Sequence, residues 1–203
     1  MANKRSSFFW TSYSDLMTAL FFVMFVLFAI ALITIMGQKE ATERQLNKIK
    51  DLQKSIETID STYFTYNKEF KRHTIKRFSG RFSPGSSDMR DMNTKEKADL
   101  REVGESLVKW LEEKKQSQPD AEYMLIIEGQ SSKDGYKRNY ELSYERALAL
   151  VKFWRKRNIT FDNLPCELII SGSGDGSEFR DEVEKNNQRF VIHIIPKPGN
   201  FDD

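Results

Sequence analysis

Residues 16–36 form an uninterrupted apolar stretch in which only Thr18 and Thr34 are polar and no residue is charged. As a helix rising 1.5 Å per residue, this stretch would be roughly 30 Å long, close to the hydrocarbon thickness of a bilayer. A cleaved signal peptide would have an apolar core of only about 7–15 residues, followed by small residues at the cleavage site. Here the polar run QKE follows instead. The pattern predicts a retained transmembrane helix, which we place at residues 8–37.

Asp15 stands at the start of this apolar stretch, where a carboxylate is costly. At the bilayer centre the cost is about 2.5–3.5 kcal/mol on insertion scales, and ionisable residues there face protein or water. If the helix begins at Phe8, Asp15 lies about two turns inside it and can take up and release a proton. If it begins at Leu16, Ser14 and Asp15 are capping residues at the headgroup level. An interfacial aromatic belt at residues 8–10 favours the deeper position.

The segment after the apolar stretch is charged but carries a second periodicity. Apolar side chains recur there at steps of three and four residues: Ile49, Leu52, Ile56, Ile59 and Tyr63. Isoleucine at one seam position and leucine at the other suits a parallel two-stranded coiled coil. A single amphipathic helix packed on its own domain would show the same pattern. Both structures remain open at this stage, and both predict a helical stalk.

The rest of the chain alternates between period-two and period-3.6 patterns. A cap at Asn93 or Thr94 is expected to start the first helix. The order β-α-β-α-β-β predicts a two-layer α/β sandwich of about 130 residues, an ordinary domain size. The expected elements are a strand running into a Pro-Gly turn within 76–89, a helix at 94–114, a strand at 122–128, a helix at 139–157, and strands at 167–171 and 189–196.

Together these patterns predict an α/β protein with a single N-terminal transmembrane helix, a helical stalk and a two-layer α/β sandwich. The expected divisions are a short N-terminus at 1–7, the transmembrane helix at 8–37, a helical or coiled-coil linker at 38–67, the domain at 68–198 and a tail at 199–203.

Composition narrows the function classes. Thirty-two Lys and Arg nearly balance thirty Asp and Glu, and the net charge of +2 gives no reason to expect a nucleic-acid partner. The single cysteine, Cys166, excludes an intrachain disulfide, and its strand-like surroundings predict a buried thiol. His73 and His193 are the only histidines and do not show metal-ligand spacing. Without a phosphate-binding loop or a familiar nucleophile motif, we expect no enzyme, no resident metal and no cofactor.

Several short motifs of the C-terminal region, in their order along the chain, resemble OmpA-like domains. FSPGSSDM is similar to their F-x-x-G-S-x-x-L, IIEGQSS to I-x-G-H-T-D, and NYELSYERA to N-x-x-L-S-x-x-R-A. SGSGDG stands in the place of their G-x-G, and NNQRFVI resembles N-R-R-V-E-I. This resemblance implies an OmpA-like two-layer α/β sandwich that binds peptidoglycan.

Upstream, WTSYSDLMT resembles the W-x-x-S-Y-A-D-M-M-T segment of the flagellar stator B subunit MotB. The MotB/OmpA-like resemblance implies a homodimer inside a ring of multi-span A subunits, with an ion-carrying aspartate matched by Asp15. Tyr13, Ser14 and Thr18 are expected to support the ion site, and the ion would be H⁺ or Na⁺. The short N-terminus and linker look most like the B subunit of the Zorya anti-phage system.

The resemblance also implies a location. It predicts a single-pass protein of the bacterial inner membrane, in contact with lipid, with a cytoplasmic N-terminus and a periplasmic domain. Charge alone leaves the orientation open, because basic residues both precede and follow the apolar stretch.

In the domain, the resemblance assigns a cell-wall pocket to one helix. Arg146 is expected to hold a diaminopimelate carboxylate through two parallel hydrogen bonds. Arg189 matches the second Arg of N-R-R and is expected to be structural or part of the pocket wall. The remaining matched helix residues are Asn139, Leu142 and Ser143.

One departure from the family pattern affects this pocket. Ser132 replaces the aspartate that usually holds the ammonium of the ligand, and Asp134 could substitute if the loop is rearranged. Three functions therefore stay open: an ion-driven motor subunit that needs Asp15, a passive wall anchor that needs Arg146, and a scaffold whose domain no longer binds.

Overall fold

The computed structural model describes residues 3–57, 59–76 and 82–197, with the side chains of residues 3–9 and 11 excepted. Residues 1–2 of the expected N-terminus at 1–7, the aromatic side chains of Phe8 and Phe9, and the expected tail at 199–203 therefore lie outside the described residues, whereas the backbone of residues 3–7 is helical. The elements, in chain order, are α1 (Asn3–Glu57), β1 (Phe64–Asn67), β2 (Arg72–Ile75), η1 (Met89–Asp91), α2 (Thr94–Ser117), β3 (Tyr123–Gly129), α3 (Asn139–Arg155), β4 (Cys166–Gly172), η2 (Glu184–Asn187) and β5 (Phe190–Pro196).

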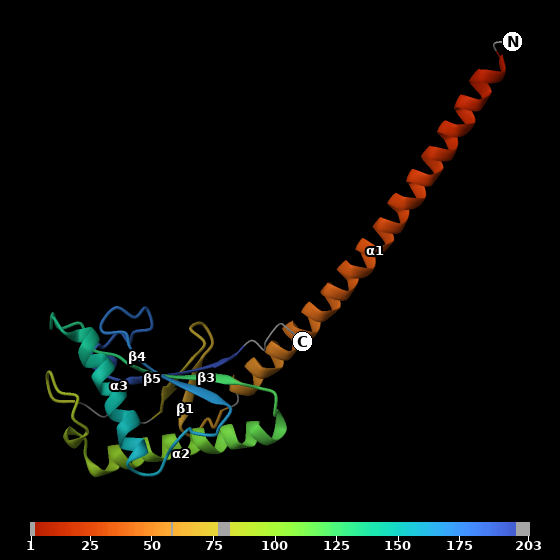
Figure 1. Ribbon diagram of the computed structural model, residues 1–203. Coiled ribbons are helices and arrows are strands. Elements are labelled where there is room, and N and C mark those ends of the chain that lie inside the picture. Colours follow the sequence, from red (N-terminus) through yellow and green to blue (C-terminus); the bar gives the residue numbers. More distant parts are fainter. Residues whose placement is uncertain (1–2, 58, 77–81, 198–203) are drawn as a thin grey trace. The chain divides into compact units, whose positions relative to one another are not determined.

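Five strands form one mixed sheet in the order β1-β2-β5-β3-β4 (Figure 1). β3 and β4 are parallel and joined through α3, and their register ends with Gly129 opposite Gly172. β5 lies between β3 and the β1–β2 hairpin. It runs antiparallel to β3, with Phe190 opposite Gly129. The last residues of β3 and β4 and the first residues of β5 therefore meet at one end of the sheet, where these strands terminate.

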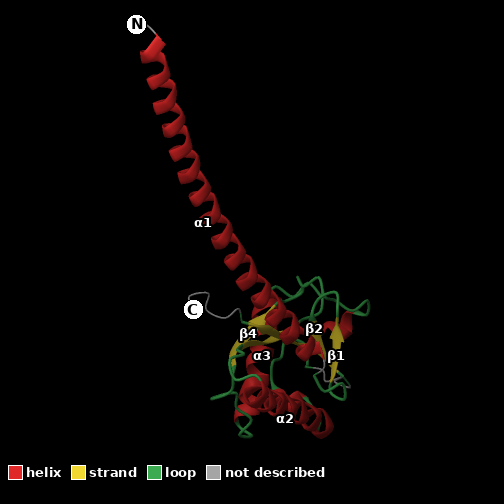
Figure 2. Ribbon diagram, turned by 90° about the vertical axis from the view of Figure 1, so that its right-hand side faces the viewer, coloured by secondary structure: helices red, strands yellow, loops and turns green. Residues whose placement is uncertain are grey.

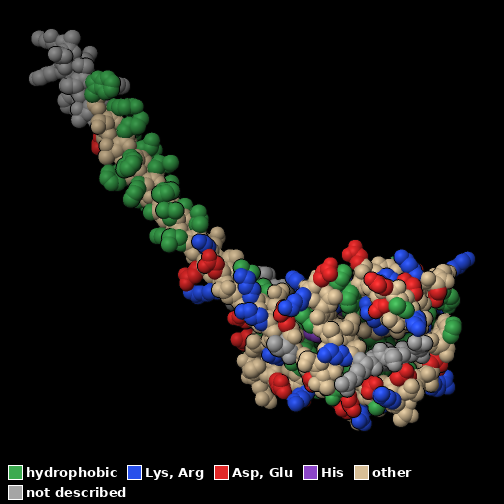
Figure 3. Space-filling model, turned by 180° about the vertical axis from the view of Figure 1, so that it is seen from behind, with side chains coloured by type: hydrophobic (Ala, Val, Ile, Leu, Met, Phe, Trp, Pro, Cys, Tyr) green, Lys and Arg blue, Asp and Glu red, His purple; other side chains and the backbone are tan. Residues whose placement is uncertain are grey.

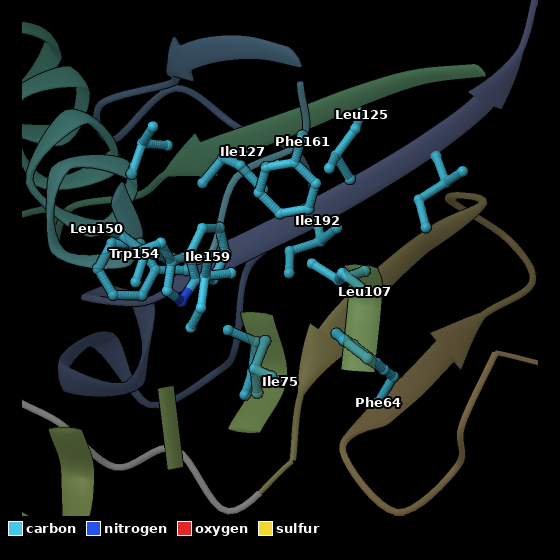
Figure 4. Packing of buried hydrophobic residues seen from close by; sticks show 14 of the residues in the cluster. Phe64, Ile75, Leu107, Leu125, Ile127, Leu150, Trp154, Ile159, Phe161 and Ile192 are labelled. Carbon is cyan, nitrogen blue, oxygen red and sulfur yellow. The ribbon is translucent and has the colours of Figure 1, made fainter. Parts of the chain in front are cut away.

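Helices cover one face of the sheet. Along β3, Tyr123, Leu125 and Ile127 are at most 1% exposed, whereas the alternate residues Met124 and Ile126 are half-buried. This alternation is that of a sheet with a single covered face. Figure 4 shows the apolar side chains of α2, α3 and the sheet packed together, and Figure 2 shows the helices and strands from the side. The predicted two-layer α/β sandwich is confirmed.

Both helices of the domain begin where the sequence predicts. The side chain of Asn93 accepts a hydrogen bond from the backbone of Glu96, whose side chain accepts one from the backbone of Asn93, forming a capping box. The face of α2 that follows is apolar and buried. In α3, Trp154 is fully buried and its indole N–H donates to the carbonyl of Leu100 at 2.7 Å, so the one polar atom of this large side chain is satisfied.

The first strand expected from the sequence, which runs into the Pro-Gly turn within 76–89, falls largely on residues 77–81 and so lies outside the described residues. Residues 82–89, which are described, contain turns and the beginning of η1 and no strand. The edge of the sheet is instead the β1–β2 hairpin, which pairs Phe64 with Ile75. Each of its strands has only four residues and mixes polar and apolar side chains. Such short edge strands give a weak periodic signal, so the pattern did not reveal them.

α1 is a single helix of 55 residues, and its apolar part is exposed in the isolated chain. Among the described residues, one segment is long and apolar enough to cross a membrane, Ser12–Glu57, with a mean hydropathy of 2.9 in its best window. On the face of α1 that Figure 3 shows, apolar side chains follow the earlier part of this stretch and charged side chains follow its later part. Because α1 begins at Asn3, Asp15 lies inside the helix and is not the N-terminal cap of a helix beginning at Leu16.

The expected linker at 38–67 divides between two compact units of the chain. Residues up to Lys50 belong to the first unit, and residues from Asp51 onwards belong to the second. Leu52, Ile56 and Ile59 are 5%, 4% and 3% exposed in the core of the second unit. They are buried by their own chain, so they cannot form the seam of a two-chain coil. Of the two structures left open by the sequence, the amphipathic helix packed on its own domain is the one observed here.

Candidate functional site: a buried polar network beside α3

The candidate site lies at the end of the sheet where β3 and β4 terminate. Two glycines allow α3 to approach these strand ends closely. A Cβ atom on Gly129 would lie 2.0 Å from the carbonyl oxygen of Ser143, and one on Gly172 would lie 2.4 Å from the backbone nitrogen of Tyr144. Any side chain at either position would push α3 away from the strands. The family-like glycine motifs therefore have a packing reason that belongs to this chain.

The four helix residues singled out by the sequence share one face of α3. Asn139, Leu142, Ser143 and Arg146 follow the i, i+3, i+4, i+7 spacing, and all four are at most 6% exposed. Asn139 and Arg146 are about two turns apart along this face. Ser143 is structural, because its hydroxyl donates to the carbonyl of Tyr140 at 2.8 Å and accepts from the backbone of Gly174 at 2.9 Å. It connects α3 to the loop that follows β4.

Arg146 is a buried cation without a carboxylate partner among the described residues. It is 2% exposed, its Nε donates to the carbonyl of Ser86 at 3.0 Å, and its guanidinium lies 4.7 Å from the centre of the Phe82 ring. Burial lowers the pKa of Arg146, while the charges of Asp134 and Asp91 act to raise it. A buried charge is costly unless it is paired, so this guanidinium is suited to receive an anion.

Asp134 lies in the loop between β3 and α3 and is held in place by its neighbours. Its carboxylate accepts from the backbone of Tyr136 at 3.0 Å, from the hydroxyl of Ser132 at 3.0 Å and from the amide of Asn139 at 3.3 Å. The backbone hydrogen bond from Tyr136, followed by those from Ser132 and Asn139, lowers the pKa of Asp134. The carboxylate is therefore ionised at neutral pH. Ser132 itself accepts from the amide of Gln188 at 3.0 Å.

Asn139 connects the two sides of this network. Its amide nitrogen donates to the carbonyl of Ser132 at 3.2 Å and to Asp134, while its side-chain oxygen is buried without a hydrogen-bond partner in the described structure. A buried acceptor of this kind carries a desolvation cost. The site thus offers a donor group, Arg146, and two acceptors, Asp134 and the oxygen of Asn139.

Arg189 contacts Gln130 and Phe179, next to the polar network. Its Nε donates to Gln130 at 3.0 Å, its Nη2 donates to the carbonyl of Phe179 at 3.0 Å, and its guanidinium lies 4.5 Å from the centre of the Phe179 ring. These contacts make it a structural residue, one of the two roles expected for it. Sequence reasoning noted Gln188 only as a departure from the N-R-R motif and missed Arg180, whose Nη2 donates to the carbonyl of Ser131 at 3.1 Å. Both come from the loop before β5, and no motif identified their partners.

A second polar cluster, also missed, lies where β3 and β5 pair. Glu128 and His193 are at most 9% exposed, and His193 Nε2 lies 2.6 Å from a carboxylate oxygen of Glu128. Ser173 donates to the other oxygen at 2.6 Å. Burial alone would raise the pKa of Glu128, but the hydrogen bonds from His193 and Ser173 outweigh it and hold the pKa at about 2. The pairing ties three neighbouring segments together, which indicates a structural role.

In α1, the expected ion-site residues divide by helical position. At about 100° per residue, Thr18 lies within about 60° of Asp15, whereas Tyr13 is about 200° away on the opposite side of the helix. The hydroxyl of Thr18 donates to the carbonyl of Ser14 at 2.7 Å. Tyr13 instead packs edge-on against Trp10, with ring centres 6.3 Å apart. Within one chain, only Thr18 of the three expected supporting side chains shares the face of Asp15. Ser12 also lies on that face, and the sequence analysis did not single it out.

No protein-family model matches the chain, and no curated protein matches it. Solved structures with a similar arrangement include the periplasmic domain of MotB, with 14% identity, a TM-score of 0.38 and coverage of 59% of each chain. A MotB-like protein from Desulfovibrio vulgaris has 14% identity, a TM-score of 0.40 and coverage of 81% of this chain and 98% of that one. The cell wall anchor of the T6SS from Pseudomonas aeruginosa has 16% identity, a TM-score of 0.42 and coverage of 68% and 92%. These values are too low to assign a family or a function, so the site must be interpreted from its own residues.

Proposed function

We propose that the chain is a single-pass inner-membrane protein whose C-terminal domain anchors it to peptidoglycan. The observation that carries this proposal is Arg146, a buried guanidinium with no carboxylate partner among the described residues, two helical turns from the unpaired oxygen of Asn139. The motif resemblance of the sequence to OmpA-like domains agrees with this reading.

The donor and acceptors suit a ligand that carries a carboxylate beside an ammonium, as diaminopimelate in wall peptides does. Arg146 would take the carboxylate through parallel hydrogen bonds. The ammonium would bind the ionised Asp134 and the side-chain oxygen of Asn139. Asp134 thereby takes the role that Ser132 cannot fill, while the Ser132 hydroxyl keeps the new carboxylate in place.

Binding of the full-length chain in detergent micelles to purified sacculi tests the anchor. Arg146→Ala is expected to lower the affinity by about 100-fold, since a charged hydrogen-bonding group is lost at a desolvated site. Arg101→Ala is the matched control, because Arg101 is half-exposed and, among the described residues, forms an ion pair only with Glu105 on the surface of α2. Equal binding by both variants would reject the anchor role at this site.

The finer proposal is that this anchor is the B subunit of an ion-driven rotary motor, used in Zorya-type defence against phage. Two chains would stand inside a ring of multi-span A subunits, and Asp15 of each would bind H⁺ or Na⁺ entering from outside. Neutralisation lowers the cost of moving the side chain past apolar surface, so the ring can advance by one position. What supports this proposal is a lone carboxylate inside an apolar helix, with Thr18 on the same face. A flagellar role is the neighbouring possibility.

Ion uptake into vesicles that contain co-expressed A and B subunits tests the motor. Asp15→Asn is expected to abolish uptake while leaving membrane insertion and assembly intact. Thr34→Val is the matched control, because the hydroxyl of Thr34 bonds only to the carbonyl of Ile30 in its own helix. Undiminished uptake in Asp15→Asn, or no uptake by an assembled wild-type complex, would leave a passive anchor or scaffold.

A further inference from the structure

A cleft runs along the side of α3, next to the candidate site. Its volume is about 630 Å³, within the usual range for ligand clefts. One wall is the loop that contains Ser87 and η1, and another is the beginning of α2 at Lys97. The floor is formed by α3 and the two residues that follow it, through Ala149, Lys152, Phe153, Lys156 and Arg157. None of these residues belongs to the polar network around Asp134.

The lining of this cleft is strongly basic. It contains five cationic side chains, Arg90, Lys97, Lys152, Lys156 and Arg157, and one carboxylate, Asp88. That carboxylate is already paired, because Arg90 donates to it through Nε at 2.8 Å and Nη2 at 2.5 Å. Hydrogen bonds from Arg90 lower the pKa of Asp88 to about 2. The other four cations have no ion pair among the described residues.

The floor of the cleft is apolar and holds one guanidinium in position. Phe153 is 6% exposed, and the guanidinium of Arg157 lies 3.7 Å from the centre of its ring. Arg157 also donates to the carbonyl of Phe153 at 3.3 Å. Stacking of this kind reduces the freedom of the side chain before any ligand binds. The cleft therefore combines an apolar base with at least one pre-positioned cation.

Stabilisation of helix ends does not account for this grouping. Cations near the C-terminus of α3 are favourable to the helix dipole, which explains Lys152, Lys156 and Arg157. Lys97, however, lies in the fourth position of α2, near the end where the dipole favours acidic residues. Arg90 comes from a separate loop. The convergence of three segments on one cleft thus requires another explanation.

The cleft continues directly from the site of Arg146. The carbonyl that Arg146 binds belongs to Ser86, and the next residue, Ser87, lines the cleft. Along α3, Lys156 lies about 15 Å beyond Arg146 at 1.5 Å per residue. A ligand held at Arg146 can therefore extend along the helix and place further acidic groups among the free cations.

We propose that this basic cleft binds further carboxylates of the same wall peptide whose diaminopimelate is held at Arg146. The first free cation along α3, Lys152, lies about 9 Å beyond Arg146 at 1.5 Å per residue. An extended peptide of about three residues covers that distance, and wall peptides carry several free carboxylates. The assignment rests on the proposed anchor function. It adds a second subsite, in which the cations of the cleft bind carboxylates of the peptide.

Full-length chain in detergent micelles is titrated with sacculi and with the soluble tripeptide alanyl-glutamyl-diaminopimelate. Lys152→Glu with Lys156→Glu reverses two charges of the cleft and leaves the contacts of Arg146 untouched. The matched control is Lys68→Glu with Lys109→Glu, two exposed lysines elsewhere on the domain with no ion pair among the described residues. We expect the cleft variant to bind both probes about ten-fold or more weakly than the control, with a reduced dependence on salt.

The outcomes separate the two proposals. If the wild-type chain binds neither probe, the anchor function and the cleft assignment both fail. If the wild-type chain binds and Arg146→Ala weakens binding but the cleft variant matches its control, only the cleft assignment fails. If the cleft variant also loses binding to glycan stripped of peptides by an amidase, the ligand is another anionic wall component and the carboxylate assignment is overturned. Equal unfolding midpoints of the two double variants show that folding is not the cause.

Discussion

Asp15 in α1 and Arg146 in α3 are each a charge without an ion-pair partner among the described residues, yet their surroundings differ. Arg146 is 2% exposed and contacts Ser86 and Phe82 from a separate loop. Asp15 is exposed within the described part of its own unit. A charge that the chain itself surrounds can act in one copy. A charge on a bare helix requires lipid, water or a second protein to complete its site.

The largest effect is expected when each of the two charges is removed separately and both ion uptake and sacculus binding are measured. Asp15→Asn should abolish ion uptake and leave sacculus binding at the wild-type level, because its effect is confined to the membrane segment. Arg146→Ala should do the reverse when uptake is measured per assembled complex. Parallel vesicle uptake and sacculus sedimentation on the same preparations check this. Loss of both activities in either variant would show that the two regions do not function independently.

Within the domain, Asp134→Asn should lower sacculus affinity by about 10- to 100-fold. The change removes a charge that would pair with an ammonium while keeping the shape of the side chain. Asp175→Asn is the control, since Asp175 makes no ion pair among the described residues and lies in the loop after β4. If both variants bind like wild type, Asp134 does not replace the carboxylate absent at Ser132.

Leu52 and Leu46 test where the membrane segment ends and the domain begins. Leu52→Ala should reduce the free energy of unfolding of the domain by about 2–4 kcal/mol, because Leu52 is 5% exposed in the core. Leu46→Ala should change it by less than about 0.5 kcal/mol, because Leu46 is 48% exposed. Denaturant titration followed by tryptophan fluorescence gives both values. If both substitutions reduced the free energy of unfolding by about 2–4 kcal/mol, the domain would begin earlier in α1, before Leu46.

The smallest effect concerns pH. Burial lowers the pKa of His73 to about 4 from its ordinary value near 6.5. Between pH 6.5 and pH 4, His73 is protonated in the unfolded chain but stays neutral in the folded chain. The free energy of unfolding therefore falls as the pH drops towards 4. His73→Gln should flatten this slope by up to about 1.4 kcal/mol per pH unit, whereas Thr74→Val on the same strand should leave it unchanged. Unfolding midpoints measured at several pH values decide between them.

The sequence predicted the parts of this molecule that depend on local spacing. The face of α3 was visible because Asn139 and Arg146 obey the helical period. The cap of α2 was narrowed to Asn93 or Thr94 because both are capping residue types that stand directly before the apolar period. The β1–β2 hairpin was missed because its strands are too short for period two to stand out. The partners of Ser132 and Gln130 could not be predicted, since Gln188 and Arg189 lie more than fifty positions away and meet them only through the sheet register.

The last turns of α1 set a limit on how this chain can be divided or recombined. Leu52 and Ile56 fill the core, and the carbonyl of Ile56 lies 3.2 Å from Nε2 of the buried His73. A fragment that begins at residue 68 would lose these side chains and the whole of β1, leaving His73 without its hydrogen bond. A chimaera that exchanges the membrane segment for that of another protein should therefore be joined at or before Lys50. The part of the chain that folds as one body begins well before the first motif that resembles a known domain.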